Sequence, residues 1–530
     1  MKSTYDSPLR GWRFVLFNTA LALGNVVVLS NVPGYTVLVP YAAGDLAGVT
    51  PSFGTWATTD HMIGLALGLP VARWFAGRFG DYRVYVATFT LYACASFVCA
   101  TSETLWMFLP ARIALGFVGG VILPVGQSLA LKEYPERLRM AGVGLWGVLS
   151  MTPFTVGVFM GGWYAEYFGW RALFYSNIAA ALPVAGIVGS LLYGRGFRRV
   201  ITRFDGVGFF LLAGVLFGTQ TILNQGNDFD WFASPLLTMS LIVVIIALPI
   251  FLIWEFGERH PVIDIRLFAY RNYAIATGCS VAGFLVVQGI LSIFMGQLQT
   301  LVGYSSSLVG LIYLTMLTVA APLVAIMHEL NRKIDTRFVA CLNFLCFAVT
   351  LTWLGLFDKP ASFDSVSFPM LFFGFSLATF FAPLAALAMH GLSGSKLIRA
   401  AEELAMLRTA AGAFGISLLA VVQFRRLPFH QLDLADHFGG RRFPSLDLVR
   451  RLVEQLQIAG FSSAAATKKL SMLIREEAAL LAMNDAFLLG AVVFVVLAAF
   501  VWFAYPTPVV PLRRKEKLRQ LRAEELIEQP

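Results

Sequence analysis

Long apolar runs recur along the whole chain and constrain its fold more than any other feature. A helix needs about 20 apolar residues to cross a hydrocarbon core of about 30 Å. Fourteen runs of this kind are bounded by charged or turn-forming residues, and they predict spans at 14–39, 55–77, 84–102, 106–131, 140–162, 171–194, 205–224, 235–256, 272–298, 307–328, 337–357, 366–391, 402–424 and 484–505. Only 13% of the residues are charged, whereas soluble domains have about 25%. The sequence therefore predicts an all-α polytopic membrane protein.

The basic residues indicate which side of the membrane each loop faces. Most of the 40 Lys and Arg residues fall in alternate loops and in the two tails, and the short loops on the other side hold only Arg171 and Lys359. Because cytoplasmic loops are enriched in Lys and Arg, we expect both tails to be cytoplasmic. An even number of spans is then required, which favours fourteen over thirteen.

Two further features argue against other functions. The pI is about 9.3, but the basic residues lie in short loops and not on one face of a soluble module, so no nucleic-acid partner is expected. The five cysteines all fall inside apolar runs, at Cys94, Cys99, Cys279, Cys341 and Cys346. We interpret them as small core residues, with no metal site or cofactor.

Two polar segments interrupt this pattern. Residues 425–483 are expected outside, where the spacing in 446–458 and 463–482 predicts short helices over the outer mouth; a disordered tether is the alternative. The tail from Leu512 is charged and helix-prone, and we interpret it as a solvated anchor beside anionic lipid.

Spans four and five carry residues that packing against lipid does not require. Arg112 lies in span four, and Pro153, Gly157, Gly161 and Gly162 lie in span five. Glycines four apart let helix backbones approach closely, and a cation inside the membrane needs a bundle interior or a water-filled cavity. This combination indicates a protein that moves something across the membrane.

Motifs in seven places resemble those of one family. They are Arg112-x-x-x-Gly116 with Pro124 and Gln127-Ser128 in span four, Pro153 with Gly157-x-x-x-Gly161-Gly162 in span five, Trp170-Arg171 with Phe174 and Asn177 in span six, Phe204-Asp205-x-x-Gly208 in span seven, His260 to Phe268 with Arg271-Asn272 before span nine, Arg408 with Gly412 and Gly415 in span thirteen, and Asn484-Asp485 with Phe487 in span fourteen. In this order they resemble the fourteen-span drug:proton antiporters of the major facilitator superfamily, the EmrB/QacA type.

The resemblance implies a domain organisation and a mechanism. It implies a six-helix half at 1–200, two inserted helices at 201–259, a second six-helix half at 260–510 that includes the outer segment 425–483, and a cytoplasmic tail at 511–530. Such halves rock around a site near the bilayer midplane. No Gly-x-x-x-x-Gly-Lys-Ser/Thr loop occurs, so a proton gradient is expected in place of ATP. The expected protein is a transporter of the cell (inner) membrane and not an enzyme.

The chain departs from the family pattern at three places. In the loop after span two, Arg78, Gly80 and Arg83 match the family motif, but Gly77 stands where its aspartate is expected, and Asp81 is the candidate substitute in the gating charge pair. Val158 replaces a proline of the span-five motif. Asn31 stands where relatives carry an acid linked to proton coupling, and asparagine cannot titrate.

Another acid must therefore carry protons if protons drive transport. Asp60 is the candidate, with His61 beside it and Arg112 as a third proton-coupling residue. The alternatives are that Asp60 faces water near the outer mouth, that His61 is a satisfied polar neighbour, and that Arg112 snorkels to an interface. The sequence leaves these alternatives open.

Four residues are candidates for the substrate path. They are Asn31, Gln127, Gln288 and Arg408. Structural pairing of Arg408 with Glu402, Glu403 or a group of span ten is an equal alternative. Aromatic residues make up 14% of the chain and would suit lipophilic compounds, although they are also ordinary in lipid-facing positions.

Proton-coupled efflux of lipophilic drugs or toxic compounds is therefore the first functional hypothesis. An exporter of an endogenous metabolite, such as a fatty acid, siderophore or organic anion, is the second. A transport-inactive or sensing membrane protein is the third, because of Asn31 and the altered loop motif, and a pore is disfavoured. The expected partners are a small molecule, protons and the lipid bilayer. In double-membraned bacteria a periplasmic adaptor and an outer-membrane channel could join through segment 425–483.

Overall fold

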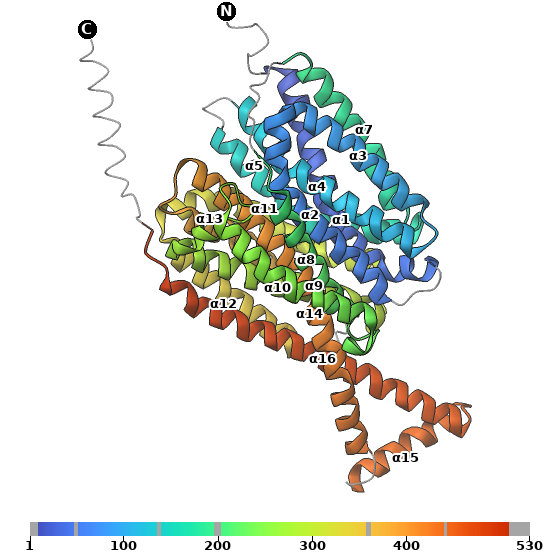
Figure 1. The fold of residues 1–530 in the computed structure, drawn as a ribbon. Coiled ribbons are helices and arrows are strands. Elements are labelled where there is room, and N and C mark those ends of the chain that lie inside the picture. Colours follow the sequence, from blue (N-terminus) through green and yellow to red (C-terminus); the bar gives the residue numbers. More distant parts are fainter. Residues whose placement is uncertain are drawn as a thin grey trace, which may run out of the picture.

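The structure is a computed structural model that describes residues 9–46, 51–134, 139–195, 203–356, 362–438 and 443–507. The interpretation of the tail from Leu512 concerns residues outside these ranges. The long helices are α1 (Trp12–Asp45), α2 (Pro51–Phe79), α3 (Asp81–Thr101), α4 (Leu105–Glu133), α5 (Arg139–Met151), α6 (Pro153–Tyr167), α7 (Ala172–Leu192), α8 (Gly206–Gln225), α9 (Pro235–Gly257), α10 (Arg271–Thr300), α11 (Ser306–Lys333), α12 (Thr336–Gly355), α13 (Phe363–Met389), α14 (Gly394–Phe438), α15 (Phe443–Ile458) and α16 (Ser463–Phe500) (Figure 1).

The helices agree closely with the predicted spans. Twelve helices of the described chain are long and apolar enough to cross a membrane, and the bent pair α5–α6 would make thirteen. The bend of 40° lies at Thr152, directly before Pro153, which has no backbone N–H to continue the helix. Residues 55–77 are also helical, in α2, but polar residues such as Asp60 and Arg73 interrupt its apolar sequence. The count of fourteen membrane spans stays a prediction.

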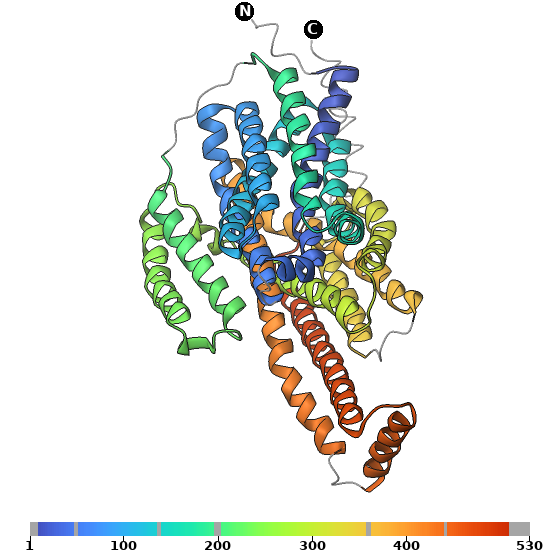
Figure 2. The ribbon, with the colours of Figure 1, turned by 90° about the vertical axis from the view of Figure 1, so that its right-hand side faces the viewer.

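The same pattern of helix contacts occurs twice in the bundle. Helix α1 packs on α6, α2 on α4, and α3 on α7; in the second set α10 packs on α14, α11 on α13, and α12 on α16. The two sets meet through α2 with α14 and α6 with α11. Helices α8 and α9 pack on each other and lie beside the bundle, with α8 against α2 and α14 (Figure 2).

Glycines set the closest contacts within both sets. A Cβ added at Gly161 would lie 2.3 Å from the carbonyl oxygen of Gly34, where α6 meets α1. A Cβ added at Gly415 would lie 1.9 Å from the carbonyl oxygen of Leu285, where α14 meets α10. At these positions only glycine lets the backbones touch, which supports the packing role predicted for such residues.

The outer segment differs from its prediction. Short separate helices over the outer mouth were expected, but α14 and α16 run without a break into this segment and α15 joins them. Residues 463–489 contain neither glycine nor proline and are rich in Ala, Leu, Lys and Glu, so the helix has no reason to stop before span fourteen. We call residues 425–438, 443–458 and 463–483 the outer extension. Figures 1 and 2 show that it projects away from the bundle and does not cover it.

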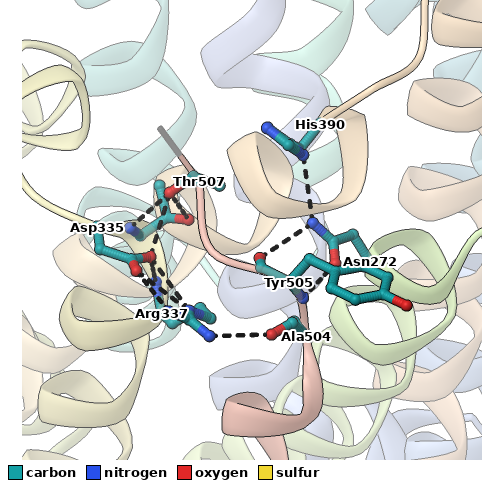
Figure 3. A network of polar contacts seen from close by, with 8 residues as sticks. Asn272, Asp335, Arg337, His390, Ala504, Tyr505 and Thr507 are labelled. Atoms are coloured by element: carbon teal, nitrogen blue, oxygen red, sulfur yellow. Dashed lines mark hydrogen bonds and ion pairs between the residues drawn. The ribbon is translucent and has the colours of Figure 1, made fainter. Parts of the chain in front are cut away.

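A polar network holds the segment after α16 against the opposite end of the bundle (Figure 3). The side chain of Asn272 donates to the carbonyl oxygen of Tyr505 and accepts from its backbone N–H, at 3.2 and 2.7 Å. Arg337 donates to the carbonyl oxygen of Ala504 and pairs with Asp335. Burial alone would raise the pKa of Asp335, but hydrogen bonds from Arg337 and Thr507 outweigh it, so the pKa lies below its ordinary value.

Candidate functional site

Arg112 is the largest fully buried side chain of the described bundle. Its Nε donates to the carbonyl oxygen of Ala57 at 3.3 Å, and its Nη1 donates to Oδ1 of Asn31. The guanidinium lies 4.3 Å from the ring centre of Tyr35, so cation–π attraction adds to these hydrogen bonds. Among the described residues no carboxylate pairs with Arg112, and its Nη2 has no partner. Arg112 therefore does not snorkel, and its charge is held by dipoles and rings alone.

Asn31 serves as a hydrogen-bond partner of Arg112 at the position where relatives carry an acid. Its amide oxygen accepts from Arg112 while its Nδ2 contacts the hydroxyl of Tyr92 at 3.4 Å. An amide can accept from a guanidinium without titrating. The site therefore keeps a hydrogen-bond partner for Arg112 and loses the negative charge that an aspartate would bring.

Asp60 and His61 lie on α2, about one turn after the carbonyl oxygen of Ala57 that accepts from Arg112. Asp60 is only 4% exposed, and its Oδ1 has no hydrogen-bond partner in the described chain. The alternative that Asp60 simply faces water is therefore wrong, because the bundle encloses its side chain. The Nδ1 of His61 lies 3.1 Å from the carbonyl oxygen of Arg112, while its Nε2 is buried without a partner among the described residues. His61 thus contacts the backbone of Arg112, and Asp60 is a separate buried carboxyl on the same helix.

Direct backbone contact fixes this arrangement. A Cβ added at Gly116 would lie 2.0 Å from the carbonyl oxygen of His61, and one added at Gly64 would lie 2.5 Å from that of Ile113. Helices α2 and α4 therefore cannot slide past each other without a clash. Gly116 is one turn after Arg112, so the same contact positions both His61 and the arginine.

The candidates from the second half lie in an aromatic region. Arg408 lies 4.6 Å from the ring centre of Phe381 and 5.8 Å from that of Phe284, and Phe154 of α6 contacts both rings. Gln288 is buried with its Nε2 3.9 Å from Sδ of Met62, so it lies where α10 faces α2. Gln127 is exposed on α4 and shares none of these contacts.

The structure does not show the alternative in which Arg408 pairs with Glu402 or Glu403. Glu402 instead pairs with Arg73 of α2, at 3.1 Å. Glu403 accepts from the backbone N–H of Asp264 at 2.8 Å and from the hydroxyl of Tyr273 at 3.2 Å. No ion pair reaches Arg408 within the described ranges, so it is a half-buried cation stabilised by aromatic rings.

Polar contacts join the two sets of helices at both ends. At the predicted outer end the hydroxyl of Tyr41 contacts that of Ser306 at 2.9 Å. Gln299 donates to the carbonyl oxygen of Val37 at 3.1 Å. Glu166 accepts from the N–H of Ser307 at 2.9 Å. At the predicted inner end the Arg73–Glu402 ion pair links α2 to α14.

The loop motif after α2 makes contacts within the first set of helices. Asp81 pairs with Lys132 and accepts from Ser128, both on α4. Arg78 lies over the ring of Trp74, and Arg83 donates to the hydroxyl of Tyr82. Gly80 has φ 91°, which only glycine adopts without strain. Asp81 therefore joins α3 to α4 and does not reach the second set.

The span-five glycines pack on both sets. A Cβ added at Gly157 would lie 2.9 Å from the ring of Pro33 on α1, and one added at Gly162 would lie 2.2 Å from the carbonyl oxygen of Ser306 on α11. Pro153, which begins α6, lies at the bend. Helix α6 therefore touches α1 and α11 along two glycine faces.

A repeated helical bundle with a buried cation and polar contacts between its two sets of helices defines the class of polytopic membrane transporters. The family model for the Major Facilitator Superfamily matches residues 21–417. The chain belongs to that family.

Several known proteins are similar to this chain over nearly its whole length. The multidrug export protein EmrB of Haemophilus influenzae is 29% identical, with 94% of this chain and 97% of that protein covered. The fatty acid resistance protein FarB of Neisseria gonorrhoeae is 28% identical with the same coverage. Among solved structures, a peptide transporter (POT) has a TM-score of 0.61 at 13% identity, covering 94% of this chain and 98% of that one. That likeness supports the fold alone.

Replacing Asn31 by alanine tests the hydrogen bond to the buried cation. We expect the Asn31→Ala variant to lose about 1.5–3 kcal/mol of stability, because a buried charged donor is left without its acceptor. Asn18→Ala is the control on the same helix, since Asn18 bonds only to the carbonyl oxygen of Phe14 one turn earlier. Thermal unfolding of the purified proteins in one detergent measures both. Equal melting temperatures for the two variants would contradict the role given to Asn31.

Proposed function

We propose that this protein exports lipophilic compounds in exchange for protons, by alternating access. The observation that carries the proposal is the buried carboxyl of Asp60, on the same helix as the carbonyl oxygen of Ala57 that accepts from Arg112, between helices that touch through glycines. A carboxyl in such a place is costly unless it serves a function. The EmrB relatives, which are named for multidrug export, support the same assignment.

Asp60 takes the role of the proton carrier in this proposal. The carbonyl oxygen of Ala57, which accepts from Arg112, lies about one turn before Asp60 on α2. A proton leaving Asp60 would leave a negative charge in the interior with no ion pair among the described residues. That cost would favour a conformation in which water reaches Asp60, and binding of a proton would favour the enclosed one.

Substrate would bind where the two halves face each other. Phe154, Phe284 and Phe381 supply apolar rings from both halves, and Gln288 supplies a polar group. Arg408 favours a second candidate function, the export of an organic anion such as a fatty acid, because its charge lies in this region without a carboxylate. The likeness to FarB, named for fatty acid resistance, points the same way.

The proposed moving bodies are residues 1–200 and 260–510, with 201–259 inserted between them. Both termini would be cytoplasmic in the inner membrane. The contacts of Tyr41, Gln299 and Glu166 would then open for release outside, and the Arg73–Glu402 pair would open for uptake from inside. This pair would replace the gating pair that Gly77 cannot form.

Efflux from inverted vesicles tests the proton carrier. We expect a proton ionophore to abolish export by the wild type, and Asp60→Asn to abolish gradient-driven export because asparagine cannot carry a proton. Asp364→Asn, an exposed acid in the first turn of α13, is the control and should transport normally.

A panel of lipophilic dyes and a labelled fatty acid, run with Arg408→Gln as well, separates the two substrate classes. Loss of fatty-acid export alone in that variant favours the anion exporter. Ionophore-sensitive export that survives Asp60→Asn would remove Asp60 from the mechanism.

A charge exchange tests the inner contact. We expect Arg73→Glu to slow transport several-fold, because two carboxylates then face each other across the halves. The double variant Arg73→Glu with Glu402→Arg should recover most of the rate, since it restores an attractive pair in the reverse order. Efflux rates at equal protein amounts provide the measurement. No recovery in the double variant would mean that the pair does not act as a gate.

The outer extension would provide the surface for a periplasmic adaptor and, through it, an outer-membrane channel. Large apolar side chains are exposed along it, among them Leu432, Ile458 and Met472, and a segment in water rarely keeps such residues uncovered. We expect photo-crosslinkers at Leu432 and Ile458 in intact cells to capture an envelope protein. A crosslinker at exposed Leu356, at the end of α12, is the control. Equal products from all three sites would argue against an adaptor.

A further inference from the structure

A second site with buried carboxyl groups lies where α8 begins and α9 ends. Asp205 caps the start of α8, and its Oδ1 accepts from the N–H of Gly208 at 2.9 Å and from Nε1 of Trp254 at 3.0 Å. Its other oxygen, Oδ2, is buried without a hydrogen-bond partner in the described chain. The helix cap accounts for one oxygen of Asp205 and leaves the other unexplained.

Glu255 lies next to this unexplained oxygen. It follows Trp254 on α9, is 1% exposed, and has no hydrogen-bond partner on either oxygen among the described residues. Both carboxyls converge on Gly208, where an added Cβ would lie 2.2 Å from Oδ2 of Asp205 and 2.6 Å from Oε1 of Glu255. The two carboxyl groups are therefore neighbours, and Gly208 leaves the space in which they meet.

The surrounding elements offer no compensating cation. From the following loop, the backbone N–H groups of Val262 and Ile263 face Glu255 without completing a hydrogen bond. From α14 comes Glu403, a further acid. The nearby cations have other partners: Arg399 pairs with Asp264, and Arg266 donates to the carbonyl oxygens of Phe256 and Glu258. No ion pair to Asp205 or Glu255 occurs in the described part of the chain.

Two adjacent buried carboxyls without a cation cannot both be ionised, because each negative charge raises the cost of the other. Donors from Gly208 and Trp254 satisfy one charge, which leaves one carboxyl in need of a proton. A metal ion is a poorer occupant, since no group of three or more suitable ligands occurs in the described ranges.

We propose that Asp205 and Glu255 share one bound proton, and that this pair is a proton-binding site where α8 begins and α9 ends. The site lies outside the region of Arg112 and Asp60 and does not depend on the proposed export function. It joins three parts of the chain, namely α8, α9 and the loop that carries Val262 and Ile263. Loss of the proton would place two negative charges side by side and opposite Glu403, and would loosen the contact of the inserted helices with α14.

The test is infrared spectroscopy of the full-length protein in lipid nanodiscs at neutral pH. A protonated carboxyl has a carbonyl stretch that shifts when H₂O is replaced by D₂O. We expect this band in the wild type and its loss in Glu255→Gln, whereas Glu258→Gln keeps it, because Glu258 is half-buried three residues further on and its carboxylate already accepts from two backbone N–H groups. The carbonyl band of this pair must also remain in Asp60→Asn. That result would show that the site does not depend on the proton carrier proposed for transport. An unchanged band in Glu255→Gln overturns the proposal.

Stability against pH gives a second readout that does not depend on transport. The folded pair binds a proton that the unfolded chain has released near neutral pH, so the folded state holds more protons and stability falls as pH rises. The ratio of folded to unfolded protein should fall up to about tenfold for each pH unit in that range. Glu255→Gln should flatten this dependence, and Glu258→Gln should not. A dependence that is equally steep in all three proteins overturns the proposal as well.

Discussion

The buried positive charge of Arg112 is the constraint on which the first half of this protein depends. A guanidinium taken out of water needs hydrogen bonds and rings around it, and here they come from three other helices: Ala57 on α2, Asn31 and Tyr35 on α1, and Phe174 on α7. These partners reach Arg112 only if the backbones of the helices, above all α2 and α4, lie close together. Gly116 and Gly64 provide that closeness, so the glycine faces and the cation form one arrangement.

In the second half, the charge of Arg408 is stabilised in a different way from that of Arg112. Arg408 is stabilised by the rings of Phe381 and Phe284, and the glutamates near it on α14 are used elsewhere. Glu402 reaches across to α2, and Glu403 holds the start of the loop before α10. The two halves therefore share their helix pairing but not their charges, with Arg112 buried among hydrogen bonds and rings and Arg408 half-buried among rings.

The sequence predicted the helices well because a span is a local property. Runs of apolar residues, bounded by charges, placed each span on one helix to within a few residues, except that 140–162 covers the two helices α5 and α6. The ends were less predictable: α14 continues to Phe438 and α16 begins at Ser463, since helix-forming residues continue beyond the membrane. The partners of the charged residues could not be read from the sequence at all. Asn31 and Arg112 are 81 residues apart, and only the packing of α1 on α4 brings them together.

The same reasoning explains which site residues were found. Arg112, Asp60 and His61 attracted attention because charged or titratable groups are rare within apolar runs, and the structure brings His61 and Arg112 into contact. Glu255 was missed because it lies near the end of a span, where an acid is usual and exposed. Its neighbour Asp205 had been singled out only as part of a motif, and nothing local links it to a residue on the next helix.

The uninterrupted course of α14 and α16 has a mechanical consequence. Both helices belong to the packed second half, and both continue into the outer extension as unbroken helices, α14 with Pro428 inside it. The 14 residues of α14 from Arg425 to Phe438 alone reach about 21 Å further, at about 1.5 Å per residue. A small rotation of the second half would therefore swing the tip of the extension through a larger arc, as a lever does. A protein bound at the tip would therefore be displaced during each transport cycle.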